Sequence, residues 1–317
     1  MPLIRSAATA LIILVVACTH SANAADRSHY DHWYPQYADH FTGVARNSCS
    51  VAIQRYQEGD PPDLVDGCEN VLTQVQCASA GVIACLLEHT TEEIKANMAA
   101  AAVVLGLLPT TLSLASSSTA EIGLLALRRP ILALLLATGA PAVSPIRAFE
   151  YREPIHMLRE EPADSQPWAT ANLVQVSWEL GTHTVISFSS DNSYLPLLWY
   201  LLTLIIHIFG TMAVYVRVSL RSDSACQEFK LSGHQPVAVL RLRKEMPVFF
   251  LFSWITSTGT IVHIIYGTML FSGTLFVGAQ DAVLVVLRYF LSTVLCRIIL
   301  MMEISGMGQS TKVFEQL

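Results

Sequence analysis

Five apolar stretches make up about half of the chain after residue 96, and they constrain its fold more than any other feature. A helix needs about 20 mostly apolar residues to cross the hydrocarbon core of a bilayer, and the last three stretches reach that length. Pro109 interrupts the first stretch, and Arg128 and Arg129 limit the second. The stretches cover residues 97–117, 130–146, 194–216, 247–271 and 282–302. We predict an all-α fold, a polytopic helical membrane protein with about five transmembrane helices.

Composition points the same way. Hydrophobic residues make up 52% of the chain and charged residues 14%, whereas a soluble domain carries about 25% charged residues. The net charge of −6 is spread along the chain, with no basic patch of the kind that binds nucleic acid. Membrane lipids are therefore predicted partners and nucleic acid is not.

The first 24 residues have the pattern of a cleavable secretory signal peptide. Arg5 precedes an apolar run from Ala7 to Cys18, and Ala22 and Ala24 are the small residues of a cleavage site. The run is too short to span a bilayer, which favours a signal peptide (1–24) over an anchor. A weak lipobox at residues 15–18 leaves lipidation as an alternative. Cleavage would place the new N-terminus outside the cytoplasm.

Residues 25–96 are polar and rich in aromatic side chains, and we predict a small extracytoplasmic domain. An even number of cysteines in an oxidising compartment indicates two disulfides, because a domain of about 70 residues has a small core. The four candidates are Cys49, Cys68, Cys77 and Cys85. Three connectivities are open, as is the alternative of four free thiols. Pairing Cys77 with Cys85 would require a turn near Gly81, since eight helical residues rise about 12 Å. Cys226 and Cys296 are expected to be unpaired.

The start of this domain carries groups able to bind a metal. Imidazoles and a carboxylate lie among aromatic residues there, at His29, Asp31, His32 and His40. Such groups can bind copper or zinc. The spacing fixes no ligand geometry, so we favour an aromatic packing surface and predict no metal and no cofactor.

Basic residues near the spans predict the orientation. If all five stretches cross, Arg128, Arg129, the loop 217–246 and the tail 303–317 lie in the cytoplasm, and the less basic loop 147–193 lies outside. If residues 130–146 fail to cross, the basic loop moves outside, against the positive-inside rule. We therefore predict a transmembrane hairpin at 97–146 and a three-helix region at 194–302. Within the outer loop, residues 173–180 alternate as a strand does, but an interfacial helix anchored by Trp168 and Trp178 is favoured.

Polar side chains recur inside the last three stretches. Thr203, His207, Thr211 and Tyr215 repeat every four residues, and His263 lies between Gly259 and Gly267, whose small size permits close helix approach. Arg288 and Ser292 share one face of the last stretch, and Arg297 points to the opposite side. A buried charge is costly at membrane depth, so these groups should face protein or water. The candidate polar site consists of His207, His263, Arg288, Ser292, Thr203 and Thr211. It either handles protons or anions or joins the helices, and the second interpretation is favoured.

The chain contains no sequence motif of zinc proteases, serine hydrolases, phosphate loops or dinucleotide-binding folds. No catalytic residue is therefore predicted, and an enzyme is the least favoured class.

One region carries a resemblance. Its residues are Cys85-Leu-Leu-Glu-His, Ile94-Lys-Ala-Asn97, Leu105-Gly-Leu-Leu-Pro109, Glu121, Arg129-Pro130, Leu134-Leu-Leu and Gly139-Ala-Pro-Ala-Val143. This region, roughly Cys85 to Tyr151, resembles a group of multi-pass membrane proteins of filamentous ascomycete fungi. The resemblance implies a fungal source and a polytopic architecture, and supplies no catalytic residues. It also draws attention to Glu121, which either forms a charged cluster with Arg128 and Arg129 or lies in a solvated loop.

Two functional classes are carried forward. The first is a sensor or scaffold in the plasma membrane or an endomembrane, whose disulfide-containing ectodomain engages an extracytoplasmic protein or small-molecule ligand. The alternative is a channel or a proton- or anion-coupled transporter that uses His207, His263 and Arg288.

Overall fold

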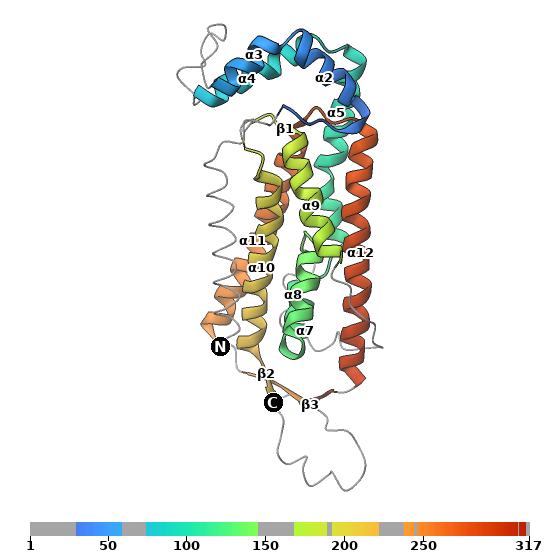
Figure 1. The fold of residues 1–317 in the computed structure, drawn as a ribbon. Coiled ribbons are helices and arrows are strands. Elements are labelled where there is room, and N and C mark those ends of the chain that lie inside the picture. Colours follow the sequence, from blue (N-terminus) through green and yellow to red (C-terminus); the bar gives the residue numbers. More distant parts are fainter. Residues whose placement is uncertain are drawn as a thin grey trace. The chain divides into compact units, whose positions relative to one another are not determined.

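The fold is helical, as predicted (Figure 1). The computed structural model describes residues 30–58, 74–144, 168–188, 192–221, 238–243, 246–309 and 311–314. Four of its helical segments are long and apolar enough to cross a membrane: Glu92–Ala115, Leu195–Arg217, Pro247–Ser272 and Ala279–Ser305. The chain is therefore a polytopic helical membrane protein. The predicted signal peptide lies outside the described residues.

The first of these segments is made of two helices. α5 (Glu92–Gly106) ends just before α6 (Leu108–Ala115) begins. Pro109 lies in the first turn of α6, where a missing backbone N–H costs little because that group has no intrahelical acceptor. The proline therefore starts a helix here and does not disrupt one.

A short helical hairpin follows. α7 (Thr119–Arg128) and α8 (Pro130–Gly139) have ten residues each, so each is about 15 Å long. The hydrocarbon core is about 30 Å thick. Residues 130–146 were expected to form the second span, but α8 ends at Gly139 and is too short to cross alone. Pro145 and Ile146, the last two residues of the expected span, lie outside the described residues.

The chain divides into two compact units. Unit 1 contains Met1–Gly106, Ser177–Leu198 and Leu270–Leu284, and unit 2 contains Leu107–Val176, Trp199–Met269 and Val285–Leu317. The chain passes between the units after Gly106, Val176, Leu198, Met269 and Leu284. One of these boundaries lies within α9 (Trp168–His183). α9 agrees with the helical prediction for this loop and contradicts the strand alternative.

Unit 1 is built around an aromatic core. The 3₁₀-helix η1 (Pro35–Tyr37) leads into α2 (Ala38–Asn47), α3 (Ser50–Glu58) and α4 (Gln74–Glu88). Trp33, Phe41 and Phe276 have ring centroids 5.2–5.4 Å apart. Phe276 follows β4 (Thr274–Leu275), which pairs antiparallel with β1 (Val185–Ile186). Residues distant in sequence thus close one core around the N-terminal helices.

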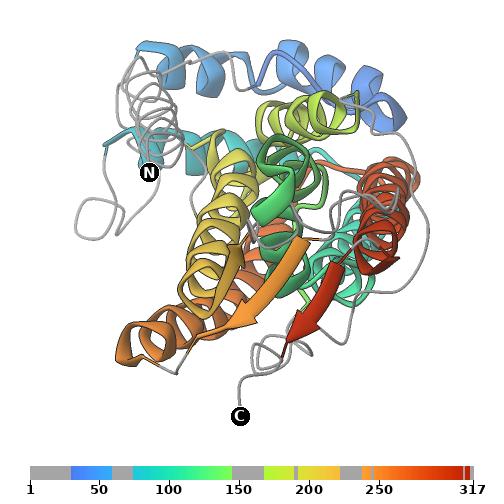
Figure 2. The same cartoon turned by 90° about the horizontal axis from the view of Figure 1, so that it is seen from below.

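Unit 2 contains most of α10 (Leu195–Arg217), α11 (Pro247–Ser272) and α12 (Ala279–Gln309). Within it the α7–α8 hairpin lies between α10 and α12, as both views show (Figures 1 and 2). The contact with α12 is apolar, with Leu125 and Leu136 of the hairpin and Leu300 of α12 in one buried cluster. The hairpin is therefore an inserted element, packed on both sides by long helices.

A small sheet, which the sequence did not predict, joins the basic loop to the tail. β2 (Val218–Arg221) pairs antiparallel with β3 (Ala238–Leu242), and β5 (Thr311–Phe314) pairs parallel with β3. β3 and β5 are the orange and red arrows of Figure 2. Backbone hydrogen bonds thus connect segments from residues 217–246 and 303–317.

Candidate functional site

Thr203 of α10 and His263 of α11 are in contact, as the predicted polar site requires. His263 Nε2 lies 3.0 Å from Thr203 Oγ1 and 2.9 Å from the backbone oxygen of Trp199. A carbonyl only accepts hydrogen bonds, so Nε2 carries the proton. The Trp199 indole stacks on the His263 ring at 4.9 Å and donates to the His263 backbone oxygen at 3.2 Å. We call Trp199, Thr203 and His263 the His263 cluster; it ties α10 firmly to α11.

His207 lies one helical turn beyond Thr203 on α10 and is 2% exposed. Among the described residues, neither of its ring nitrogens has a hydrogen-bond partner, and the same holds for His263 Nδ1. Buried polar groups are normally satisfied. These three nitrogens are the part of the predicted site that helix packing does not explain.

Hydroxyl groups on α10 and α12 donate hydrogen bonds to backbone oxygens at and just after the end of α8. Its last carbonyls lack intrahelical partners, and the hydrocarbon core offers no water to replace them. The side chain of Ser292 on α12 donates to the Gly139 oxygen at 2.9 Å, and Tyr200 on α10 donates to the Thr138 oxygen at 2.6 Å. Thr203 donates to the Pro141 oxygen at 2.8 Å. Ser292 and Thr203 therefore support a helix that ends inside the bundle.

Arg288 and Thr211 do not belong with these groups. The Arg288 side chain is exposed on α12, whereas Ser292 is buried, so the predicted shared polar face is not a buried one. Thr211 lies where α10 packs on α7, since a Cβ on Gly123 would come within 3.4 Å of the Thr211 Cα. The expected six-residue site is thus divided among several local roles.

Arg297 enters the interior of unit 2. Its guanidinium lies 2.6 Å from Glu121 of α7 and donates to the Ser116 oxygen at 3.4 Å. Glu121 also accepts from the Ser118 N–H at 2.7 Å, while Ser118 caps Glu121 in return. The capping box and Arg297 thus provide hydrogen-bond partners for backbone groups at the break between α6 and α7. The Ser144 N–H also donates to the Ser117 oxygen there.

The solvated loop, one of the two alternatives for Glu121, is wrong, because this residue is buried within α7. Arg129 pairs with Glu303 of α12 at 2.7 and 2.8 Å, and Glu121 with Arg297. The capping-box pattern was readable in the sequence from Ser118 and Glu121. The distant partners of Arg129 and Glu121 could not be predicted, because Glu303 and Arg297 both lie on α12, more than 170 residues away along the chain.

A groove runs beside the His263 cluster. It has a volume of about 310 Å³ and is lined by residues of α10 and α11, among them Phe209, Gly259, His263 and Tyr266. Apart from His263 and Thr256 its lining is apolar or aromatic. The groove is therefore suited to an apolar molecule and not to a hydrated ion.

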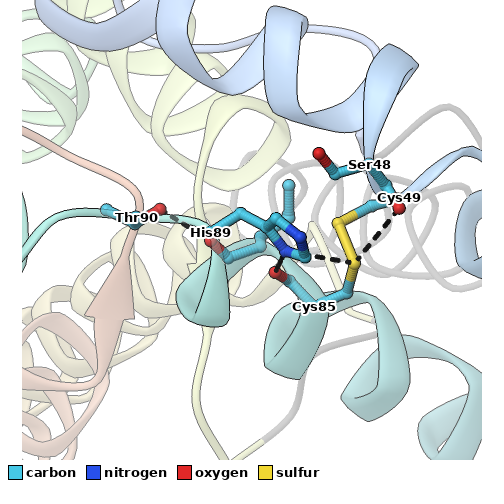
Figure 3. The surroundings of a disulfide bond; sticks show 6 residues. Ser48, Cys49, Cys85, His89 and Thr90 are labelled. Atoms are coloured by element: carbon cyan, nitrogen blue, oxygen red, sulfur yellow. Dashed lines mark hydrogen bonds between the residues drawn. A yellow bond between two sulfur atoms is a disulfide. The ribbon is translucent and has the colours of Figure 1, made fainter.

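The disulfide prediction is confirmed for Cys49 and Cys85. Their sulfurs are bonded, joining the start of α3 to α4 within unit 1 (Figure 3). α4 is continuous through Gly81, and Cys77 within it is also disulfide-bonded. Cys68 lies outside the described residues. Cys296 is free and buried, as expected.

Cys49, Cys85 and His89 do not form a metal site. The Cys49 and Cys85 sulfurs and a ring nitrogen of His89 lie within 4.8 Å of one another, and Figure 3 shows the His89 ring beside the bond. The sulfurs are bonded to each other, however, so neither is a thiolate ligand. His89 Nδ1 instead lies 3.0 Å from the Cys85 backbone oxygen, to which it can donate.

The predicted N-terminal ligands also have other neighbours. His32 packs edge-on against His183, and His40 against Phe41. His29 lies outside the described residues. In the part of the segment that is described, the aromatic packing interpretation therefore fits better than metal binding.

Comparison of the chain with protein-family models, curated proteins and solved structures gives no match.

Proposed function

We propose that the protein is a membrane sensor or scaffold whose disulfide-bonded N-terminal region engages an extracytoplasmic ligand. This region, residues 25–96, is called the N-terminal unit below. In this proposal the N-terminal unit lies outside and the β2–β3–β5 sheet lies in the cytoplasm of a plasma membrane or endomembrane. The predicted leader and the basic loop support this orientation. The β3–β5 pairing adds support, because hydrogen-bonded strands must lie on one side of a bilayer.

The observation that carries the proposal is a hydrogen-bond network at the start of α12, all within unit 1. Asn97 of α5 accepts from the Ala279 N–H at 2.8 Å, and Gln36 accepts from the Gln280 N–H at 3.0 Å. The Gln36 N–H in turn donates to Asp281 at 3.0 Å. The first N–H groups of a helix have no intrahelical acceptor, so the N-terminal segment caps a helix that runs on to Gln309.

Close backbone approach makes this network specific. A Cβ on Gly278 would lie 2.0 Å from Gln36 Oε1, so the Gln36 side chain would have to leave this position to make room for it. The N-terminal segment is therefore seated on the start of α12, and a change in its packing can reach that helix directly.

Amide hydrogen exchange in nanodiscs tests this coupling. Removing the Cys49–Cys85 bond in a Cys49→Ser/Cys85→Ser variant should loosen the N-terminal unit and speed exchange at Gln36, Ala279 and Gln280. Glu92→Gln is the control, because it removes only the exposed Glu92–Lys95 pair. Unchanged exchange at these three amides in the disulfide variant would show that the unit does not act on α12, and would overturn the proposal.

Proton-coupled transport is the second candidate, favoured by the unpartnered nitrogens of His207 and His263. It predicts proton flux into proteoliposomes under a pH gradient, and loss of that flux in His207→Leu. The sensor proposal predicts that proteoliposomes with wild-type protein and with His207→Leu leak protons at the same low rate.

A further inference from the structure

A second pocket lies on the N-terminal unit, beside α2 and α3. Its volume is about 330 Å³, at the lower end of the range of roughly 300–1,000 Å³ for small-molecule sites. Tyr30 and Trp33 form part of its lining and are 4% and 9% exposed. Tyr30 shares a hydrogen bond of 2.6 Å with the Ser79 hydroxyl, and Trp33 is packed against Phe41. This buried floor is therefore fixed in place before any ligand arrives.

The exposed part of the lining carries one charge of each sign. Asp31 and Arg46 both line the pocket and both are exposed. Among the residues that the structure describes, neither side chain forms an ion pair or a hydrogen bond. Gln54 lines the same pocket, and its amide nitrogen is already engaged with Glu58 at 2.8 Å, so its oxygen is left as an acceptor.

We propose that this pocket binds a small zwitterion, a free α-amino acid, with its carboxylate on Arg46 and its ammonium group on Asp31. A guanidinium presents a planar pair of donors that matches a carboxylate. Asp31 and the Gln54 oxygen accept from the ammonium group, and the apolar part of the ligand lies against Ile53. The two pocket charges cancel, so a zwitterion suits the site better than an ion of either sign.

A neutral sugar is the less favoured ligand. Sugars stack on exposed aromatic faces, and the rings of Tyr30 and Trp33 are buried against the core of unit 1. The inference rests on the proposed sensor function, for which it names the class of ligand.

Calorimetry on the full chain in nanodiscs tests the inference with the twenty common L-amino acids as probes. At least one apolar amino acid should bind, and its decarboxylated amine and its N-acetyl derivative should not. Arg46→Gln and Asp31→Asn should each weaken binding by roughly 10- to 150-fold, since each removes a charged hydrogen-bond partner. Arg55→Gln on α3 and Asp39→Asn on α2 are matched controls outside the pocket lining and should bind as the wild type does.

Three outcomes would overturn the inference. No amino acid binds at millimolar concentration, the two pocket variants bind an amino acid as tightly as the wild type does, or neutral sugars bind and amino acids do not. Any of these leaves the sensor proposal to its amide-exchange test. Conversely, amino-acid binding that leaves amide exchange at Ala279 and Gln280 unchanged would contradict the sensor function but would confirm that the pocket binds an amino acid.

Discussion

A single glycine sets how closely α11 approaches its neighbours in unit 2. A Cβ on Gly267 would lie 2.3 Å from Trp199 Nε1 and 2.8 Å from Pro109 Cγ. Gly267→Ala should therefore lower the free energy of unfolding by about 1–3 kcal/mol through overpacking. Gly259→Ala on the same helix is the control, because its nearest neighbour, Ile206, would be 3.5 Å away. Thermal unfolding of both variants in one detergent checks the contrast, and equal stability of the two would refute it.

His183 gives the fold a dependence on pH. Burial lowers the pKa of His183 below its usual 6.5, and the nearby His32 lowers it further, against an opposing effect of Glu179. The folded protein thus resists a proton that the unfolded chain accepts near pH 6.5. Stability should be complete above about pH 6.5 and fall as the pH decreases from there to the folded pKa.

Unfolding measured at pH 7.5 and 5.5 checks this sign. His183→Gln should reduce the difference between the two pH values, whereas His89→Gln, on an exposed ring, should keep it. A difference that persists in full without His183 would assign the effect to other groups.

At the scale of elements, the α7–α8 hairpin depends on side chains from α10 and α12. Thr203→Val removes the donor to the Pro141 oxygen and should cost about 0.6 kcal/mol and at most about 1.7 kcal/mol, the average and the maximum for hydrogen bonds between membrane helices. Thr203→Ser keeps the hydroxyl and should retain most of the stability. The free energy of unfolding of both variants in mixed micelles checks this difference. A valine variant as stable as the wild type would show that Thr203 does not stabilise the end of α8.

The buried pair at the α6–α7 break should behave differently from a surface pair. The Glu121 and Arg297 side chains are 6% and 19% exposed, so Glu121→Gln or Arg297→Gln alone should cost about 3–5 kcal/mol by leaving the other charge unpaired. The double variant should cost much less than the sum. Glu92→Gln in the exposed Lys95 pair should cost at most about 1 kcal/mol. Additive single effects in the double-mutant cycle would contradict a direct interaction.

These elements also show what the sequence can predict. Three long spans were predictable because a bilayer demands about 20 apolar residues. The α7–α8 hairpin was not, because α8 ends where Ser292 and Tyr200 satisfy its last carbonyls and Thr203 satisfies that of Pro141, just beyond the helix. Helical periodicity assigned Arg288 to the site and Arg297 to the opposite face. That periodicity does not reveal which face meets Glu121.

For the whole molecule, the order of apolar and basic segments predicted a polytopic helical chain with a disulfide-bonded N-terminal region. It could not choose among cysteine pairings, since Cys49 and Cys85 meet only through the packing of α3 on α4. The division of the helical bundle into two units and the pairing of the tail with the basic loop also arise from tertiary contacts. The resemblance to fungal membrane proteins stays a prediction.

The central proposal is an orientation, with residues 25–96 outside the membrane and the basic loop and the tail in the cytoplasm. The chain has only four lysines: Lys95, in unit 1, and Lys230, Lys244 and Lys312, in the basic loop and the tail. A membrane-impermeant amine reagent applied to intact cells, or to sealed vesicles with the N-terminal side outward, should modify Lys95 alone. All four lysines should be modified after permeabilisation. Modification of Lys230, Lys244 or Lys312 before permeabilisation, as read by mass spectrometry, would contradict the account.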